Sequence, residues 1–200
     1  MEERALNQLK LILERQGAKI PVVENVNATD KAVHIRMGEF DVVVHKKSKV
    51  SEKDIRAVLG EPEDADSDAA RKRPNMISVY TVKPSETVEN IIRASLATGY
   101  INNYFHLKEL QIDITQHRMF PPHFLFNEEF KKANPTIVEQ FNKFRMKDPV
   151  NDLPRMDSLD IGARLVGAHP GDIVYIRRHS DTVGYAPMFR HVVRDANVEQ

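Results

Sequence analysis

Residues 167–184 read GAHPGDIVYIRRHSDTVG, and this stretch decides the fold that we expect for the C-terminal part of the chain. Gly and Pro bracket the run from Ile173 to Ile176, whose β-branched and aromatic side chains favour an extended backbone. The pattern predicts a strand that is entered through a tight turn. A second strand is expected after Gly184, so that the two strands form a hairpin.

Several motifs in and around this hairpin resemble those of one protein family. They are ITQH at 114–117, PPH at 121–123, LPRM at 153–156, GAHPGDIVYI at 167–176, RRHSDTVG at 177–184 and FR at 189–190. Their order is similar to that in the C-terminal assembly domain of the fifth subunit shared by eukaryotic nuclear RNA polymerases, which has a small archaeal counterpart. The resemblance runs from about Leu110 to Val193.

The resemblance also implies which residues bind a partner. The family typically shows LPRI, then I-R-x-S-E-T-A-G, then a YR pair. The matching positions of this chain are Pro154, Arg155, Arg178, Ser180, Thr182, Gly184 and Arg190. The chain departs from the family pattern at Ile161, where a proline is usual, at Asp181, where a glutamate is usual, and at residues 186–187. These departures affect the expected local loop and strand contacts.

The composition excludes several classes of protein. The chain has 200 residues, 41% of them hydrophobic, which suits one large or two small domains with real cores. It has no Cys, which excludes a disulfide framework and a thiolate metal site and fits a reducing intracellular compartment. No apolar run approaches the ~20 residues of a membrane span, so we expect a soluble protein without membrane contact. Lys and Arg total 29, as do Asp and Glu, so any contact with DNA must be local.

Residues 1–107 are predicted to form an α/β domain. Apolar residues recur at helical spacing over residues 2–16, with Gly17 placed to end the helix, and they alternate on both sides of Gly38, which predicts a hairpin. The further elements expected are a short helix at 51–60, a surface loop at 61–68 followed by a basic segment at 71–74, a buried strand at 76–82, a helix from Ser85 to Gly99, and a strand at Tyr104 and Phe105. The resemblance implies, from position in the chain, that this is the family's jaw domain, with a restriction-endonuclease-like fold beside downstream DNA.

Residues 108–200 are predicted to form a smaller, mixed α/β domain. Asn134 followed by Pro135 favours a helix start. The apolar stripe of that helix, expected to be core, consists of Ile137, Val138, Phe141 and Phe144. Asp157 or Ser158 can cap a further helix that ends at Gly167.

We predict no catalytic, cofactor or metal site. A nuclease would need a second acid two residues before a lysine, but Val44 takes that position between Asp41 and Lys46. The neighbours at 179–181 are His, Ser and Asp, yet adjacent residues of an extended chain point to opposite faces and cannot form a catalytic triad. Three further histidines, His106, His117 and His123, are spaced too irregularly to indicate zinc.

The basic hairpin remains as a candidate surface. Arg177, Arg178 and Arg190 are opposed only by Asp181 before Asp195. The planar guanidinium group suits carboxylates, backbone carbonyls and phosphates, so docking on another chain is one interpretation and an ordinary solvated hairpin is the other. The family resemblance favours docking.

We therefore expect a non-catalytic subunit of a DNA-directed RNA polymerase, a nucleotidyltransferase, which functions in transcription. It would dock on the largest subunit, contact other polymerase subunits and, weakly, downstream DNA, and it would not be a homo-oligomer. The limited N-terminal match suggests a divergent lineage, such as a large DNA virus that encodes its own polymerase. The protein would act in the nucleus if it is cellular, and in a viral factory or virion if it is viral. The alternatives are a stand-alone nuclease-fold protein and a transcription regulator with a polymerase-like tail.

Overall fold

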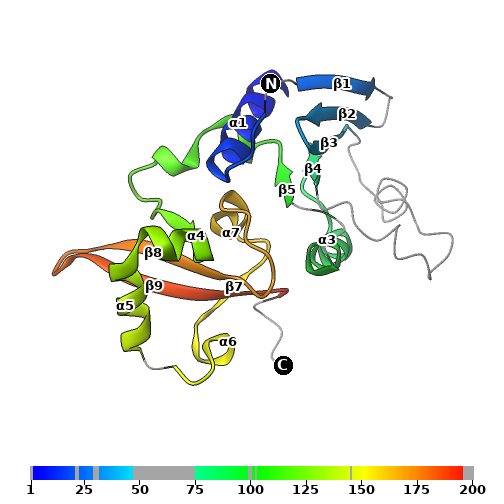
Figure 1. The fold of residues 1–200 in the computed structure, drawn as a ribbon. Coiled ribbons are helices and arrows are strands. Elements are labelled where there is room, and N and C mark those ends of the chain that lie inside the picture. The colour runs from blue at the N-terminus through cyan, green and yellow to red at the C-terminus, as the bar shows by residue number, and fades with distance from the viewer. Residues whose placement is uncertain are drawn as a thin grey trace. The chain divides into compact units, whose positions relative to one another are not determined.

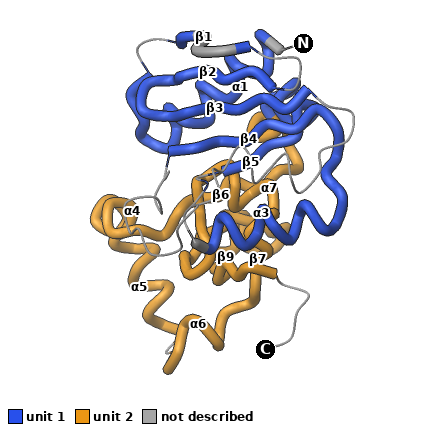
Figure 2. Tube along the Cα trace, turned by 90° about the vertical axis from the view of Figure 1, so that its right-hand side faces the viewer, with its two compact units in different colours: residues 1–113 blue, residues 114–200 orange. Residues whose placement is uncertain are grey.

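The computed structural model describes residues 2–20, 23–28, 32–46, 75–98, 101, 103–144 and 146–195. The chain divides into two compact units, residues 1–113 (unit 1) and residues 114–200 (unit 2), which Figure 2 shows in blue and orange. Each unit has its own mixed sheet together with helices, which confirms the predicted α/β fold class. The predicted domains, 1–107 and 108–200, place the division slightly upstream, and their independence stays a prediction.

Unit 1 is built on a five-stranded sheet in the order β1-β2-β3-β4-β5 (Figure 1). The strands are β1 (Val23–Ala28), β2 (Ala32–Met37), β3 (Phe40–His45), β4 (Met76–Tyr80) and β5 (Asn103–His106). β1, β2 and β3 pair antiparallel, whereas β3, β4 and β5 pair parallel. The predicted hairpin is confirmed, because Met37 pairs with Phe40 across a turn in which Gly38 has a φ of 61°.

Two helices lie in the described part of unit 1, and both are where they were predicted. They are α1 (Glu2–Arg15) and α3 (Glu86–Thr98). Each buries apolar residues spaced three or four apart, such as Leu9 and Leu13 in α1 and Val88 and Ile92 in α3, so each gives one face to the core. A 3-10 turn, η2 (Glu109–Gln111), follows β5. The helix expected at 51–60 and the segments at 61–68 and 71–74 lie outside the described residues.

Unit 2 contains a four-stranded sheet in the order β6-β8-β9-β7. The strands are β6 (His123–Leu125), β7 (Arg155–Asp157), β8 (Ile173–Ser180) and β9 (Gly184–Val193). β8 and β9 form the predicted antiparallel hairpin, and both are longer than the apolar runs suggested, because the ladder continues through polar residues. The 3-10 turn η3 (Ile114–Gln116) precedes the sheet.

The helices of unit 2 are α4 (Glu128–Ala133), α5 (Pro135–Lys143), α6 (Pro149–Asp152) and α7 (Ile161–Leu165). α5 begins at Pro135 as predicted, but Phe144 lies beyond its last residue and is 56% exposed, so the predicted core stripe is wrong at that position. The predicted N-terminal cap of α7, Asp157 or Ser158, is also wrong. Asp160 caps that helix by accepting a hydrogen bond from the Gly162 N–H at 2.7 Å, since the chain turns at residues 158–159 before the helix begins.

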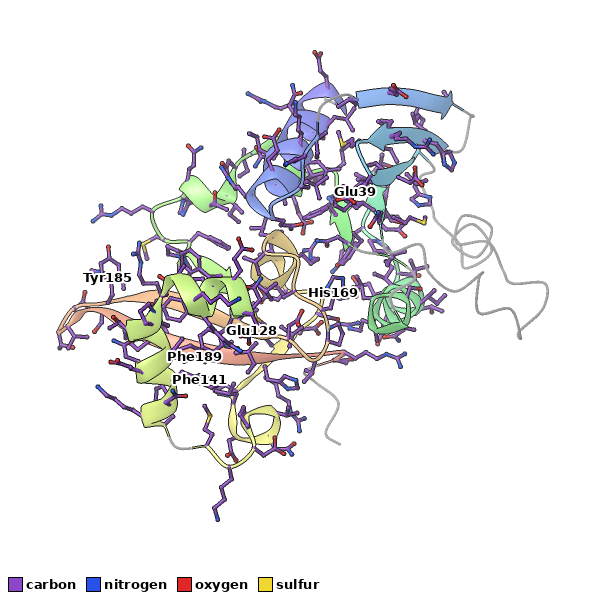
Figure 3. All side chains as sticks on the ribbon, in the orientation of Figure 1. Glu39, Glu128, Phe141, His169, Tyr185 and Phe189 are labelled. Carbon is purple, nitrogen blue, oxygen red and sulfur yellow. The ribbon has the colours of Figure 1, made fainter. Side chains whose placement is uncertain are left out.

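The sheet of unit 2 is packed on both faces. Met156, Val174, Ile176 and Val192 form a cluster with Ala163 of α7, and we call this side of the sheet the α7 face. On the opposite side, the α5 face, Tyr175 and Phe189 pack with Phe126 and with residues of α4 and α5. Figure 3 labels Phe141 of α5 beside Phe189, and their ring centroids are 4.9 Å apart. Helices on both sides therefore make this short sheet a core in its own right.

Candidate protein-docking surface

The β8–β9 hairpin passes from a buried root to an exposed tip. The root, residues 173–176 and 188–193, contains fully buried side chains such as Val174 and Val192. The tip, residues 177–187, has no fully buried side chain, and Val183 and Tyr185 are 70% and 58% exposed. The hydrogen-bonded ladder nevertheless continues to the last pair, Ser180 with Gly184. The tip residues are thus held in place by the backbone without contributing to a core.

The register of the ladder assigns each tip residue to a face, because paired residues share a side of the sheet and neighbours along a strand alternate. Val174 pairs with Arg190 and belongs to the α7 face. The α7 face of the tip therefore carries Arg178, Ser180, Gly184 and Ala186. The α5 face of the tip carries Arg177, His179, Tyr185 and Pro187.

Three of the predicted docking residues shape the turn of the hairpin. Gly184 has a φ of 75°, a left-handed conformation that residues with a Cβ adopt at a cost, at the end of a three-residue loop. The hydroxyl oxygens of Ser180 and Thr182 are 3.2 Å apart across the turn. These residues consequently have a role in folding. The hydroxyl groups of Ser180, which is half-exposed, and Thr182, which is exposed, also lie at the tip of the hairpin.

Arg178 has no comparable role in folding. It is exposed on the α7 face, opposite Ala186. Within the described ranges, no carboxylate forms an ion pair with it. A guanidinium group without an internal partner keeps all five of its N–H donors for water or for another molecule.

Of the remaining predicted residues, Arg190 lies in the root, and Pro154 and Arg155 lie beside it. β7 pairs parallel with β9, and the Pro154 carbonyl accepts a hydrogen bond from the His191 N–H at 3.0 Å. The Arg190 guanidinium donates to the Arg155 carbonyl at 3.0 Å. Arg155 pairs with His191, so its side chain belongs to the α5 face, whereas Arg178 and Arg190 share the α7 face.

The structure thus separates the three predicted arginines. Val174, the partner of Arg190, precedes Arg178 by four residues along β8, which corresponds to ~13 Å at the usual rise of a strand. Arg155 lies on the other side of the sheet. A flat partner surface on the α7 face could meet Arg178 and Arg190 together, but Arg155 only at the edge of the sheet.

Two histidines of the sheet have lowered pKa values: His191 at the root, and the half-buried His123 in β6. His191 is 7% exposed, and burial together with the nearby Arg155 guanidinium lowers its pKa, while Asp148 and Asp172 act in the opposite direction. Burial likewise lowers the pKa of His123, whose Nδ1 lies 2.6 Å from the Pro121 carbonyl oxygen. Burial therefore favours the neutral form of both rings.

His123 is also in close contact with α7. A Cβ placed on Gly162 would lie 2.5 Å from the His123 Nε2, so only glycine fits without a shift of the ring. His123 is the histidine of the PPH motif, and Gly162 is the second residue of α7. The histidine of the PPH motif is therefore accounted for by its packing against Gly162, and it need not be part of a binding site.

The residues considered for a nuclease are dispersed. Asp41 is exposed and forms an ion pair with Arg36 at 3.2 Å, whereas Val44 is buried beneath α1 among apolar side chains. In the part of the chain that the structure describes, no three His, Cys, Asp or Glu side chains are grouped as a metal site would require. None of the helices described has the length and apolar character needed to span a bilayer.

The sequence did not indicate Tyr185 and His179, two exposed residues of the α5 face, as partner-binding. Tyr185 lies under the Arg177 guanidinium, with 4.8 Å between the ring centroid and the Arg177 Cζ. The His179 ring approaches Tyr185 edge-on, with ring centroids 5.9 Å apart. Arg177 and His179 are two residues apart on β8, so the sequence indicated that their side chains share a face. Tyr185 lies on that face because strand pairing places it opposite His179, which the sequence alone does not show.

Comparison with known proteins assigns unit 2 to a recognisable domain. Residues 112–192 match the family model of the C-terminal domain of RNA polymerase Rpb5. The chain is 35% identical over 85 residues to the DNA-directed RNA polymerase subunit Rpo5 of Thermococcus onnurineus, which is 42% of this chain and 94% of the relative. It is 28% identical over 146 residues to the RPABC1 subunit of RNA polymerases I, II and III of Caenorhabditis elegans, which is 73% of this chain and 62% of the relative. A match of that length extends well into unit 1.

Proposed function

Because this chain belongs to the Rpb5 family of DNA-directed RNA polymerase subunits, which includes Rpo5 and RPABC1, we propose that it assembles into such an enzyme by docking unit 2 on the largest subunit. The family's subunits have no catalytic role of their own, and this chain contributes binding surfaces and no active site. Its partners are the other subunits of the polymerase. It acts in the nucleus if the polymerase is cellular, and in a viral factory or virion if the polymerase is viral.

Unit 2 is the docking unit because of what the archaeal relative contains. The matched 85 residues make up 94% of that polymerase subunit, and the family model matches residues 112–192, which belong almost entirely to unit 2. A protein of that size has room for the docking domain and little else. The surface that joins this chain to a polymerase is therefore expected on unit 2.

The single observation that carries the position of the surface is the exposed, unpaired Arg178 on the α7 face. Its guanidinium has no ion-pair partner among the described residues, and the neighbouring Ser180 and Thr182 add hydroxyl groups at the same end of the hairpin. Burying such a group at an interface is favourable only when the partner supplies carboxylate or carbonyl acceptors. We therefore assign the docking contacts to Arg178, Ser180 and Thr182 at the tip, with Arg190, Pro154 and Arg155 at the edge formed by β7.

Unit 1 has a different role in this proposal. The nematode relative matches over a stretch that includes part of unit 1, and the family's jaw domain is the counterpart suggested by the order of the chain. Unit 1 would then lie near downstream DNA and contact it weakly. With Lys plus Arg equal to Asp plus Glu at 29 each, the chain has no net charge to drive tight DNA binding by itself.

A competition experiment tests the docking surface. Tagged wild-type chain and an Arg178→Ala variant are expressed together in cells that contain the polymerase, the enzyme is purified through its largest subunit, and mass spectrometry measures the ratio of the two chains. Losing a charged hydrogen bond at an interface costs ~2 kcal/mol, which corresponds to incorporation of the variant lower by about thirtyfold. Arg194→Ala, at an exposed position just beyond β9, is the matched control and should incorporate normally. Equal incorporation of Arg178→Ala and the wild-type chain would place the docking surface elsewhere.

The nuclease alternative is tested with the purified chain. Because Val44 is buried beneath α1, the position of a second acid faces the core and not a bound metal ion. We expect no DNA cleavage with magnesium or manganese. Cleavage that survives repurification and disappears in Asp41→Ala would support a nuclease. Incorporation of the chain only at substoichiometric levels would instead favour a transcription regulator.

A further inference from the structure

The α5 face of the hairpin tip carries a stacked basic and aromatic cluster that folding does not require. Arg177, Tyr185 and His179 are all exposed, and the Arg177 guanidinium lies 4.8 Å above the centre of the Tyr185 ring. The edge of the His179 ring meets the same tyrosine at a centroid distance of 5.9 Å. We call these three residues the tip cluster. Figure 3 shows Tyr185 far out along the hairpin, away from the labelled Phe141 and Phe189.

The cluster begins where the cover of the sheet ends. At the root, the same face is covered by α4 and α5, whose aromatic rings pack on Tyr175 and Phe189. The ring of Phe144, just after α5, has its centroid 6.0 Å from that of Phe189 and is itself 56% exposed. Residues 177–187 of the hairpin are exposed or half-exposed, and a bare two-stranded ribbon is only marginally stable in water.

The hairpin tip carries two arginines, Arg177 and Arg178, and a single acid, Asp181. Asp181 lies 3.5 Å from His179 and is fully exposed, whereas no ion pair among the described residues reaches Arg177. On the other side of the ladder, Arg178 adds a second positive charge. A partner that complements this surface must therefore bring carboxylates or other anions.

We propose that the tip cluster binds an acidic segment of another polymerase subunit, with a carboxylate on Arg177 and the apolar part of the segment against Tyr185. The proposal rests on the assembly function given above and adds a second binding face to it. The Arg177 guanidinium lies over the Tyr185 ring, with its Cζ 4.8 Å from the ring centroid, and a guanidinium held there can donate two hydrogen bonds to one carboxylate. The hairpin tip is then bound on both faces, with the largest subunit on the α7 face and the acidic segment on the α5 face.

A protein segment fits this surface better than a nucleic acid. A nucleic acid that binds through its phosphates requires a row of basic residues, and each phosphate contact adds to the salt dependence of binding. The α5 face of the tip offers Arg177 and His179, with the fully exposed Asp181 beside them. One side of the Tyr185 ring is already covered by the guanidinium, which limits the stacking of bases. A short acidic peptide can bind with one carboxylate on the Arg177 guanidinium and its apolar atoms against the Tyr185 ring.

Competition for incorporation also tests this proposal, with variants that separate the two faces. Arg177→Ala and Tyr185→Leu should each incorporate about fivefold less than the wild-type chain, as expected for a contact of moderate energy at an interface. Tyr185→Phe restores the ring and should rescue incorporation, whereas Arg177→Lys keeps the charge but loses the planar fork and should not. Val183→Ala, at an exposed position of the turn, is the control. Higher salt should reduce the difference between Arg177→Ala and the wild-type chain.

The outcomes distinguish this inference from the proposed function. Normal incorporation of Arg177→Ala and Tyr185→Leu, together with reduced incorporation of Arg178→Ala, would show that the tip cluster does not bind a partner. The proposed docking through the α7 face would not be affected. Normal incorporation of all three would overturn both. With the purified full chain, a fluorescent polyglutamate peptide should bind more weakly to Arg177→Ala than to the wild-type chain. If labelled single-stranded DNA lost binding in these variants while their incorporation stayed normal, the surface would be a nucleic-acid site and the proposal would be wrong.

Discussion

The root and the tip of the β8–β9 hairpin share one continuous ladder of backbone hydrogen bonds, but the side chains of the root are buried or half-buried and those of the tip are exposed or half-exposed. At the root, Val174 is fully buried and Phe189 is 3% exposed, each packed by helices on its own side of the sheet. At the tip, Arg177, Arg178 and Tyr185 are exposed. A substitution at the root removes core contacts, whereas one at the tip leaves the core unchanged.

This difference explains how a polymerase subunit can be recognised from its hairpin. Residues of the root are those that any sheet packed on two faces would select, namely β-branched and aromatic side chains. Residues of the tip are not selected by folding beyond the turn at Gly184. The proposed docking accounts for the arginines of the tip, which the fold does not require.

The largest effect is expected from Phe189→Ala at the root. The Phe189 ring packs against the rings of Phe126, Phe141 and Tyr175 at centroid distances of 4.9 to 5.3 Å. Removing it should lower the free energy of unfolding of unit 2 by ~3–5 kcal/mol, because a cavity is left in an aromatic core. Denaturant unfolding followed by the amide signals of unit 2 measures the loss. A loss below ~1 kcal/mol would show that the root is not a tightly packed core.

The next effect is expected from Gly162→Ala in α7. The new Cβ would lie 2.5 Å from the His123 Nε2, so the ring or the helix must move. Overpacking of this kind costs ~1–3 kcal/mol. In a chain that also carries His123→Ala, the clash is absent and the cost of Gly162→Ala should nearly vanish. Additive losses in the double variant would contradict the contact.

The stability of unit 2 should also depend on pH through His123 and His191. The pKa values of His123 and His191 are lowered by burial from the ordinary 6.5, so the unfolded chain binds protons more readily than the folded one. The contribution of neutral rings is fully present above pH 6.5 and is lost as the pH falls through the folded pKa values. Thermal unfolding between pH 7.5 and pH 5 should show this loss. His191→Leu should flatten the profile, and an unchanged profile would mean that the ring is solvated in solution.

Arg190 marks the border between the two regions. Its guanidinium donates to the Arg155 carbonyl at 3.0 Å and so ties β9 to the edge strand β7. Arg190→Ala should cost ~1 kcal/mol of stability, the usual net value of one hydrogen bond. Its incorporation into the polymerase must therefore be compared with that of a variant destabilised equally at the root. An unchanged free energy of unfolding would assign Arg190 to the partner alone.

The smallest effect on folding is expected at the tip itself. Arg177→Ala and Arg178→Ala remove exposed side chains without ion-pair partners in the described ranges. Each should change the free energy of unfolding by less than ~0.5 kcal/mol. The same two variants should show the largest losses of incorporation, on opposite faces. A large loss of stability in either one would remove the distinction between root and tip.

Much of the secondary structure was predictable because it follows from local periodicity. The helix α1, the β2–β3 hairpin and the β8–β9 hairpin each have a long pattern of apolar residues. The strands β6 and β7 contain three residues each, too few for any pattern, and β1, with the sequence VENVNA, lacks a strict alternation of apolar and polar residues. These strands form because a neighbouring strand offers its backbone hydrogen bonds, which no local signal reports.

The candidate surface was predictable in its residues but not in its geometry. The motifs around the hairpin identified Arg178, Ser180, Thr182 and Gly184, and they lie together at the tip. Arg155 was assigned to the same surface, but its pairing with His191 turns it toward the α5 face. Tyr185 and Arg177 went unnoticed as a pair because they are eight positions apart in the sequence and only the register brings their side chains into contact.

The order of residues alone determined the fold class, the main helices, both hairpins and the family, since each follows from patterns that are read along the chain. Tertiary structure decided which face of the sheet each arginine takes, which residue caps α7, and which side chains lie beyond the cover of the helices. The physical reason is that side-chain direction in a sheet depends on the pairing of strands that are distant in sequence. A shift of one residue in that register would exchange the two faces.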